Sequence, residues 1–457
     1  MNPPAITVPA LLSVYIKMNT RDNIAAPATA VGGAVTIIRL SGPDVLEIAN
    51  KVWQGKPLSG NHVRKMILGK VAGDQALAVY MKAPGSYTGD DVVEFQCHGG
   101  AAAADAVMRA VLAAGCRLAE PGEFTCRAFI NGKLDLLQAE AVADIISSAS
   151  DAALKMAEKQ LDGVLSSRIG KICDELNFLR SECEARLDFP DEELDFDDSV
   201  PERISAVKLE LEELLATHRA GAVLRDGVQV VLAGRPNAGK SSLLNRLLGF
   251  ERAIVSNIPG TTRDTVREET VLRNIPVHLT DTAGLRESAD PVEKLGIERS
   301  YQTISGAEVT FWLLDASADD PVEEAASFDP AAPGVIPVWN KCDLAKDRKL
   351  PELPLPAVKI SAVADEDFPE LLDEFERRVL SVARHAPPEV AVNARSASQI
   401  EKALPHCDLA RQWFGEGCYE LCACELASAA HAVGVIIGRN VDPDLLDAVF
   451  HRFCLGK

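Results

Sequence analysis

The chain has 457 residues, 47% of them apolar and 25% charged, which is ordinary for a folded globular protein and predicts about three domains. Its 67 acidic and 47 basic residues give a net charge of −20, which argues against nonspecific nucleic-acid binding over the whole surface and leaves room only for a local basic patch. The 11 cysteines are too sparse for a disulfide framework and predict reduced thiols in a cytoplasmic protein.

The first residues are expected to be an extension of the fold. The apolar stretch 9–18 is too short to span a bilayer and lacks the basic flank of a signal peptide, so no membrane segment is predicted. Residues 1–17 are expected to lie upstream of a translation start at Met18.

Short strands and helices alternate up to residue 118. Strands are predicted at 34–40, 76–81 and 92–97, with a Gly/Pro turn at 84–89 and an Ala-rich helix that runs from His98-Gly-Gly to residue 114. This mixture predicts a small α+β domain.

The next segment and the end of the chain have helical patterns. Residues 134–187 and 200–218 are almost free of Pro and Gly and repeat apolar residues at three and four positions, and the pattern resumes at 396–454. Residues 319–337, rich in Asp, Ala and Pro, are expected to form a loop for most of their length. We predict a multidomain α+β and α/β protein with an α+β N-terminal domain (1–118), a discontinuous helical-bundle domain (119–217 and 384–457) and an inserted P-loop G domain (218–383).

A phosphate-binding loop opens the inserted domain. A buried strand from Val228 leads into Gly234-x4-Gly239-Lys240-Ser241 and then a helix, which is the setting that this motif requires. Glycines let successive N–H groups turn inward, and the helix N-terminus adds partial positive charge for phosphates. The predicted nucleotide contacts are Asn237, Ala238, Gly239, Lys240, Ser241 and Ser242, with the Ser241 hydroxyl on Mg²⁺.

Three further motifs indicate that the nucleotide is GTP. A strand ends in Asp281-Thr-Ala-Gly284, and another precedes Asn340-Lys-Cys-Asp343, whose carboxylate can accept both guanine N1–H and N2–H bonds. The candidate switch I, 260–264, supplies Thr262 to Mg²⁺. The predicted GTP contacts before and within these motifs and beside the base are Ser256, Thr261, Thr262, Asp281, Thr282, Ala283, Gly284, Asn340, Lys341, Asp343, Ser361 and Ala362.

The catalytic residues differ from the Ras pattern. Leu285 follows Gly284, so no Gln is available there to orient the attacking water. The side-chain oxygen of Asn237 suits either a monovalent cation beside the phosphates or a hydrogen bond that stabilises the loop, and the sequence leaves both open.

Taken together, these motifs resemble the MnmE (TrmE) family of tRNA-modification GTPases over about residues 22–457. The resemblance is carried by EFQCHGG (94–100), PGEFTCRAF (121–129), KLDLLQAEA (133–141), LDFPDEELDF (187–196), GRPNAGKSS (234–242), IPGTTRD (258–264), DTAGLRE (281–287) and FCLGK (453–457). It implies a K⁺-activated homodimeric GTPase. The implied K⁺ ligands are Asn237, Ser256, Ile258 and Thr261.

The resemblance also implies roles for residues that are ambiguous on their own. Glu293, otherwise a solvated helix charge, would orient the attacking water. Arg39 and Glu94, otherwise an ordinary ion pair, would bind a tetrahydrofolate derivative together with Lys133 and Lys457.

The tail and a cysteine-rich segment carry further thiols. Cys454 matches the family's C-x-G-K signature and is either a nucleophile near Lys457 or a buried helix-end thiol. A second group of cysteines and histidines has side chains that can bind zinc. Their spacing along the chain would not bring them together around one ion, so these residues are expected to pack in the core. Its members are His406, Cys418, Cys422, Cys424 and His431.

The implied activity is K⁺-dependent GTP hydrolysis coupled to C5 modification of wobble uridine-34 in tRNA. The resemblance also implies a heterotetramer with an FAD-containing, MnmG-like partner, and the use of a folate one-carbon donor. The rivals are a regulatory GTPase such as a ribosome-assembly factor and a folate enzyme that uses GTP only structurally. Neither a folate-like N-terminal domain nor a Cys454 tail is needed by a regulatory switch.

Overall fold

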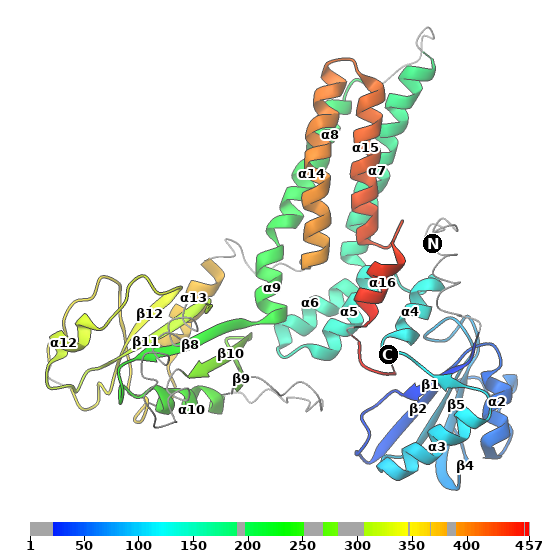
Figure 1. Ribbon diagram of the computed structural model, residues 1–457, viewed down its shortest axis with the longest axis horizontal. Coiled ribbons are helices and arrows are strands. Elements are labelled where there is room, and N and C mark those ends of the chain that lie inside the picture. Colours follow the sequence, from blue (N-terminus) through cyan, green and yellow to red (C-terminus); the bar gives the residue numbers. More distant parts are fainter. Residues whose placement is uncertain are drawn as a thin grey trace, which may run out of the picture. The chain divides into compact units, whose positions relative to one another are not determined.

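The protein is described by a computed structural model that covers residues 22–189, 197–250, 268–281, 306–345, 348–365, 367–381, 390–451 and 453–456. The protein divides into two compact units (Figure 1). The first comprises Met1–Ala143, Gln160–Leu209 and Ser398–Lys457; the second comprises Asp144–Lys159 and Glu210–Ala397.

A seven-stranded sheet forms the N-terminal part of the first unit, in the order β3-β4-β5-β6-β2-β1-β7. Neighbouring strands are antiparallel except β1 and β7. The three predicted strands are confirmed as β2, β5 and β6. The strands are β1 (Ile24–Pro27), β2 (Val35–Ser41), β3 (Trp53–Gly55), β4 (Ile67–Val71), β5 (Asp74–Met81), β6 (Val92–His98) and β7 (Arg117–Leu118).

The two faces of this sheet differ. Alternate residues such as Ile38, Leu40 and Phe95 point into a core that α2 (Val45–Val52) and α3 (Ala101–Ala113) cover. A single-turn helix, η1, spans Gly60–His62. The opposite face is partly open: Val35 and Leu68 are exposed there, and Leu77 and Val79 are half-buried.

The predicted helical segments are confirmed as helices. Residues 134–187 form α5 (Leu136–Ser147), α6 (Asp151–Leu161) and most of α7 (Val164–Asp188), interrupted at Gly163 with a φ of 81°. The remaining helices of the bundle are α4 (Glu123–Ile130), α8 (Val200–Ala216), α14 (Ala394–Gly415), α15 (Tyr419–Ile436) and α16 (Pro443–Phe450).

Figure 1 shows α7, α8, α14 and α15 lying alongside one another. An apolar stripe on α7, which includes Ile169, Leu176 and Leu179, is buried where this helix packs against α15. α15 is long and apolar enough to span a bilayer, but 56% of it is buried inside the protein, as in the core helix of a bundle.

The second unit contains a six-stranded sheet in the order β13-β12-β11-β8-β10-β9, parallel except for the β9–β10 pair. Its central strands are continuous apolar runs because both faces are covered. The strands are β8 (Val228–Gly234), β9 (Glu268–Leu272), β10 (Ile275–Asp281), β11 (Val309–Asp315), β12 (Val335–Asn340) and β13 (Val358–Lys359). This unit also holds most of α6 and the end of α8. Its other helices are α9 (His218–Asp226), α10 (Lys240–Phe250), α12 (Pro321–Ala326) and α13 (Pro369–Ser381).

Residues 319–337 are outside helices and strands for just over half their length, as expected, but they also contain α12 and the start of β12. Asp320 caps α12 by accepting hydrogen bonds from the backbone N–H groups of Val322 and Glu323, and Pro321 occupies the first turn. The predicted fold class is confirmed: an α+β sheet domain, a helical bundle in two pieces and an inserted P-loop domain.

Candidate functional site

The phosphate-loop motif lies between β8 and α10, at the carboxyl end of a central strand. Two of its glycines have no room for a side chain. A Cβ on Gly234 would lie 2.2 Å from the Leu313 carbonyl oxygen, and one on Gly239 would lie 2.1 Å from the Asn340 amide nitrogen. Both have positive φ, 132° and 96°, so the turn that precedes α10 depends on glycine at these positions.

The side chains of this loop divide into buried and exposed groups. Lys240 is 7% exposed, and its Nζ donates to the carbonyl oxygens of Gly234 and Arg235, both at 2.9 Å. The ammonium is therefore folded over the loop. Asn237 has a φ of 65°, and it is exposed, as is Ser241. Both residues therefore lie at the surface of the loop.

The buried amide of Asn340 joins three predicted GTP-binding segments. Its Nδ2 donates to the Ala238 carbonyl at 2.8 Å, and its Oδ1 accepts from the Ala362 N–H at 2.9 Å. Asn340 is 1% exposed, so both hydrogen bonds are shielded from water. The structure thus brings the phosphate loop, the end of β12 and the segment after β13 to one place.

Asp315, at the end of β11, was not predicted as a site residue. Its Oδ2 lies 2.6 Å from the Lys341 Nζ. Burial raises the pKa of this carboxyl, but hydrogen bonds from Lys341 and Ser317 outweigh burial and leave the pKa lowered. The ion pair fixes Lys341 next to Asp343, which is half-buried.

Several predicted residues lie outside the described part of the chain: Ser256, Ile258, Thr261, Thr262, Thr282, Ala283, Gly284, Glu293 and Lys457. The side chain of Asp281 is likewise not described, although its backbone ends β10 beside Leu232 of β8.

A second cluster lies on the open face of the N-terminal sheet. Arg39 and Glu94 are directly opposite each other on β2 and β6, and Arg39 Nε lies 2.8 Å from Glu94 Oε1. The guanidinium also lies over the rings of Tyr87 and Phe124, 5.4 and 5.7 Å from their centroids. The ion pair is present, and two aromatic faces flank it.

The Gly/Pro turn between β5 and β6 contributes to this cluster. Lys133 Nζ donates to the Pro84 carbonyl at 3.0 Å, and the Tyr87 hydroxyl lies 2.8 Å from the Thr125 hydroxyl. Burial raises the pKa of Tyr87. Lys133 is thus held beside the turn that carries Tyr87.

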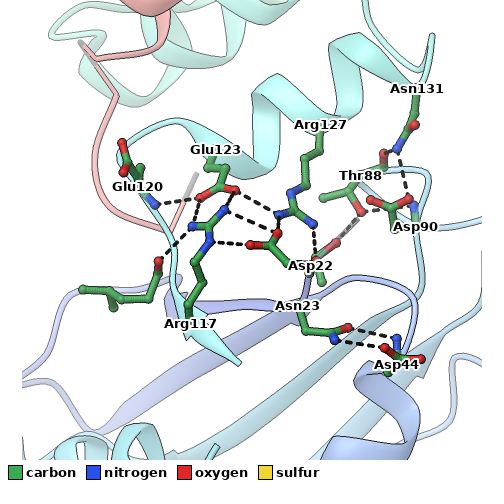
Figure 2. Close-up of polar contacts among 12 residues, drawn as sticks. Asp22, Asn23, Asp44, Thr88, Asp90, Arg117, Glu120, Glu123, Arg127 and Asn131 are labelled. Carbon is green, nitrogen blue, oxygen red and sulfur yellow. Dashed lines mark hydrogen bonds and ion pairs between the residues drawn. The ribbon is translucent and has the colours of Figure 1, made fainter. Parts of the chain in front are cut away.

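Buried charges hold α4, the helix that carries Phe124. Figure 2 shows Arg127 and Glu123 of α4 beside Asp22 and Arg117. Arg127 Nη2 lies 2.6 Å from Asp22 Oδ1 and 2.9 Å from Glu123 Oε1, and Arg117 Nη2 lies 2.6 Å from Glu123 Oε1. The side chains of Arg127 and Glu123 are 1% and 2% exposed. Burial raises the pKa of Glu123, but the hydrogen bonds from Arg117 and its neighbours outweigh burial and lower it overall.

The C-terminal motif reaches the same cluster. Phe453 packs among buried residues of α4, α5 and α16. Gly456 lies against β1, with a φ of 90° and a position where a Cβ would be 1.9 Å from the Pro27 carbonyl oxygen. Its own carbonyl oxygen is 3.4 Å from Arg39 Nη1. The exposed Cys454 therefore lies two residues from a contact of Arg39, and its interpretation as a buried thiol is wrong.

The cysteine-rich segment of α15 also differs from expectation. The prediction of core packing is confirmed for Cys422, which is buried, but it is wrong for Cys418 and Cys424, which are exposed. His406 Nδ1 lies 2.6 Å from Glu425 Oε2.

Comparisons with known proteins cover nearly the whole chain. Residues 23–133 match the family model "GTP-binding protein TrmE N-terminus", and residues 136–454 match "MnmE helical domain". Among solved structures, the chain is similar to the G domain of the T. maritima FeoB iron transporter, with 26% identity, a TM-score of 0.25, and coverage of 34% of this chain and 98% of that chain.

Full-length relatives carry the same family name. The protein "tRNA modification GTPase MnmE" of Symbiobacterium thermophilum is 42% identical over 95% of this chain and 99% of its own length. The protein of that name from Geotalea uraniireducens is 40% identical over 96% of this chain and 100% of its own length. The chain therefore belongs to the MnmE family of tRNA modification GTPases.

Proposed function

We propose that this chain is a K⁺-dependent GTP hydrolase that acts on tRNA, in the C5 modification of wobble uridine-34 with a folate one-carbon donor. The observation that carries the proposal is the meeting of Arg39, Glu94 and the 453–456 segment on the N-terminal sheet. A regulatory GTPase has no need of a guanidinium–carboxylate pair between aromatic rings, or of an exposed thiol two residues from the glycine that contacts it.

The folate part of the proposal rests on charge and ring geometry. The carboxylate of Glu94 suits the amino-pyrimidinone edge of a pterin, and the rings around Arg39 suit a flat heterocycle. Calorimetric titration with 5-formyltetrahydrofolate should show binding to the full chain and loss of binding in Glu94→Gln. His98→Gln, on an exposed pair with Asp74 at the end of the same strand, is the matched control and should bind normally. Equal binding by both variants would contradict the assignment.

The cation part of the proposal rests on Asn237 and on Leu285, which stands where Ras has a Gln. The exposed Asn237 side chain and the Ser241 hydroxyl would hold K⁺ and Mg²⁺, which would supply positive charge beside the phosphates. Asn237→Ala should abolish the K⁺ stimulation of GTP hydrolysis and leave the affinity for GTP unchanged. If stimulation survives, the amide serves the loop and not the cation.

We infer assembly from the open face of the N-terminal sheet. Val35 and Leu68 are 55% and 61% exposed there, and a second copy of the chain would bury them in a homodimer. The heterotetramer with an FAD-containing, MnmG-like partner and a cytoplasmic location are part of the same proposal. The net charge of −20 favours a partner that supplies much of the affinity for tRNA. If this chain alone bound tRNA tightly in a filter-binding assay, with a steep dependence on salt, the partner would not be the main source of tRNA affinity.

The decisive experiment is mass spectrometry of wobble uridines in tRNA from cells that lack this chain. We expect unmodified uridines, restored by the wild-type chain and not by Cys454→Ser. Cys418→Ser, which removes another exposed thiol, is the matched control and should restore modification. A normal profile without the chain would refute the modification function and favour a regulatory GTPase.

A further inference from the structure

Two buried thiols meet inside the helical bundle. Cys183 of α7 and Cys422 of α15 are both fully buried, and their Sγ atoms are 3.4 Å apart although 239 positions separate them in the chain. Both helices belong to the same compact unit and pack along their length. Small residues such as Ala423 and Ala430 on α15 allow this close approach.

The surroundings make the two thiols chemically unequal. The hydrogen bond with Cys422 lowers the pKa of Cys183, burial opposes this, and the positive charge of Arg186 lowers the pKa further. That guanidinium lies over the rings of Phe414 and Tyr419, at 5.1 and 5.5 Å from their centroids. The same thiol–thiol contact and burial raise the pKa of Cys422. One sulfur is therefore suited to act as the thiolate and the other to keep its proton.

We propose that Cys183 and Cys422 form an oxidation site that closes to a disulfide in the presence of hydrogen peroxide. The Cys183 thiolate attacks one peroxide oxygen, the O–O bond breaks and hydroxide leaves, so that a sulfenic acid forms. The Cys422 sulfur then attacks the Cys183 sulfur, an S–S bond forms, the S–OH bond breaks, and water leaves with the thiol proton. Two thiols and one peroxide thus yield one disulfide and two waters.

The geometry needs only a small adjustment. To form the bond, the sulfurs must approach from 3.4 Å to about 2.05 Å. The pairing is also selective. Cys173 is buried too, but its thiol faces the Ala430 carbonyl oxygen at 3.7 Å, whereas the thiol of Cys183 faces that of Cys422 at 3.4 Å.

The disulfide would tie together the two pieces of the helical domain. Cys183 precedes the residues 210–397 of the second unit, and Cys422 follows them. A closed covalent loop would then contain residues 210–397, the larger part of the second unit, and α7 could not separate from α15. Oxidation would thereby keep α7 and α15 packed together, and it would not modify the nucleotide-binding residues.

The test treats the folded full chain with hydrogen peroxide, then unfolds it and alkylates it under non-reducing conditions. We expect two fewer alkylated cysteines than the 11 of the reduced chain and a proteolytic peptide pair joined through Cys183 and Cys422. Dithiothreitol should reverse both. If peroxide oxidises the exposed Cys418, Cys424 or Cys454 and the joined peptide is absent, the proposal is wrong.

Variants add an independent readout. Cys422→Ala should lose the joined peptide, and Cys407→Ala, which removes a buried thiol on α14, should keep it. Oxidised wild-type chain should also lose less helical signal at a given temperature than reduced chain, and Cys422→Ala should show no such difference. Peptide mapping uses the wild-type chain alone. The proposal can therefore still be refuted if a variant fails to fold.

Discussion

Replacing Glu123 by Gln should destabilise α4 because it removes one charge from a buried network. In the wild-type chain, two guanidinium groups, Arg117 and Arg127, face two carboxylates, Asp22 and Glu123. The Glu123→Gln substitution would keep the size of the side chain and one hydrogen-bond acceptor, but it would leave the network with an excess positive charge.

The magnitude follows from burial. The side chain of Arg127 is 1% exposed, so water cannot compensate for the missing carboxylate. Removal of one partner from a buried ion pair costs about 3–5 kcal/mol, and the remaining Asp22 contact at 2.6 Å favours the lower end, about 3 kcal/mol. Since 1.4 kcal/mol is a factor of ten in an equilibrium, amides of α4 should exchange with solvent on the order of 100-fold faster.

The effect should depend on pH in one direction. The pKa of Glu123 is lowered in the folded chain, so its contribution is complete above the unfolded value of about 4.3 and is lost as pH falls through the folded value. The difference between wild type and Glu123→Gln should therefore be constant near neutral pH and shrink below about pH 4.

Hydrogen exchange of the full chain, with peptides that cover α4, measures the effect. Asp105→Asn is the matched control, because it breaks an ion pair with Arg109 in which both side chains are more than half exposed, and such pairs contribute about 0–1 kcal/mol. Unchanged α4 protection in Glu123→Gln, or equal loss in both variants, would refute the assignment of stability to the buried charges.

Three further predictions concern the two sites. Gly239→Ala would place a Cβ 2.1 Å from the Asn340 amide nitrogen and should reduce GTP turnover by about 100-fold, whereas Gly249→Ala on α10, with no atom within 4 Å, should not. Asp343→Asn should weaken GTP binding by about 100-fold, because unpaired buried polar groups cost about 1–3 kcal/mol each. The variant should prefer xanthosine triphosphate in a competition assay, and an unchanged base preference would contradict the predicted base pocket. Gly456→Ala should release the tail to limited proteolysis without affecting GTP binding, whereas Gly417→Ala, also at positive φ but with open space around it, should leave the tail protected.

The sequence predicts most reliably what lies within a short stretch. The phosphate loop combines a strand, glycines at positive φ and a helix start within about a dozen residues, so its local geometry follows from residue types. The missed helix α12 had a local signal too, since Asp320-Pro321 followed by two Glu is a helix start.

Other parts depend on contacts between distant segments. Nothing near Lys341 in the sequence shows that Asp315 of another strand would pair with it. The surroundings of Arg39 likewise come from three separate segments, which supply Tyr87, Phe124 and Gly456. The burial of Glu123 and Arg127 is also invisible in the sequence, because charged residues on a helix are usually solvated.

The contact between Arg39 and Gly456 joins positions 417 residues apart, and it has a consequence for synthesis on the ribosome. At about 5–20 residues per second, the ribosome synthesises β2 roughly 20 s or more before it reaches the C-terminal residues that contact Arg39. During that interval a nascent N-terminal sheet presents Arg39, Glu94 and the flanking rings without the tail. A chain released before residue 453 would contain the sheet and the nucleotide loop but not Cys454 or the Gly456 carbonyl. Prematurely terminated chains should therefore bind nucleotide and yet lack the complete second site.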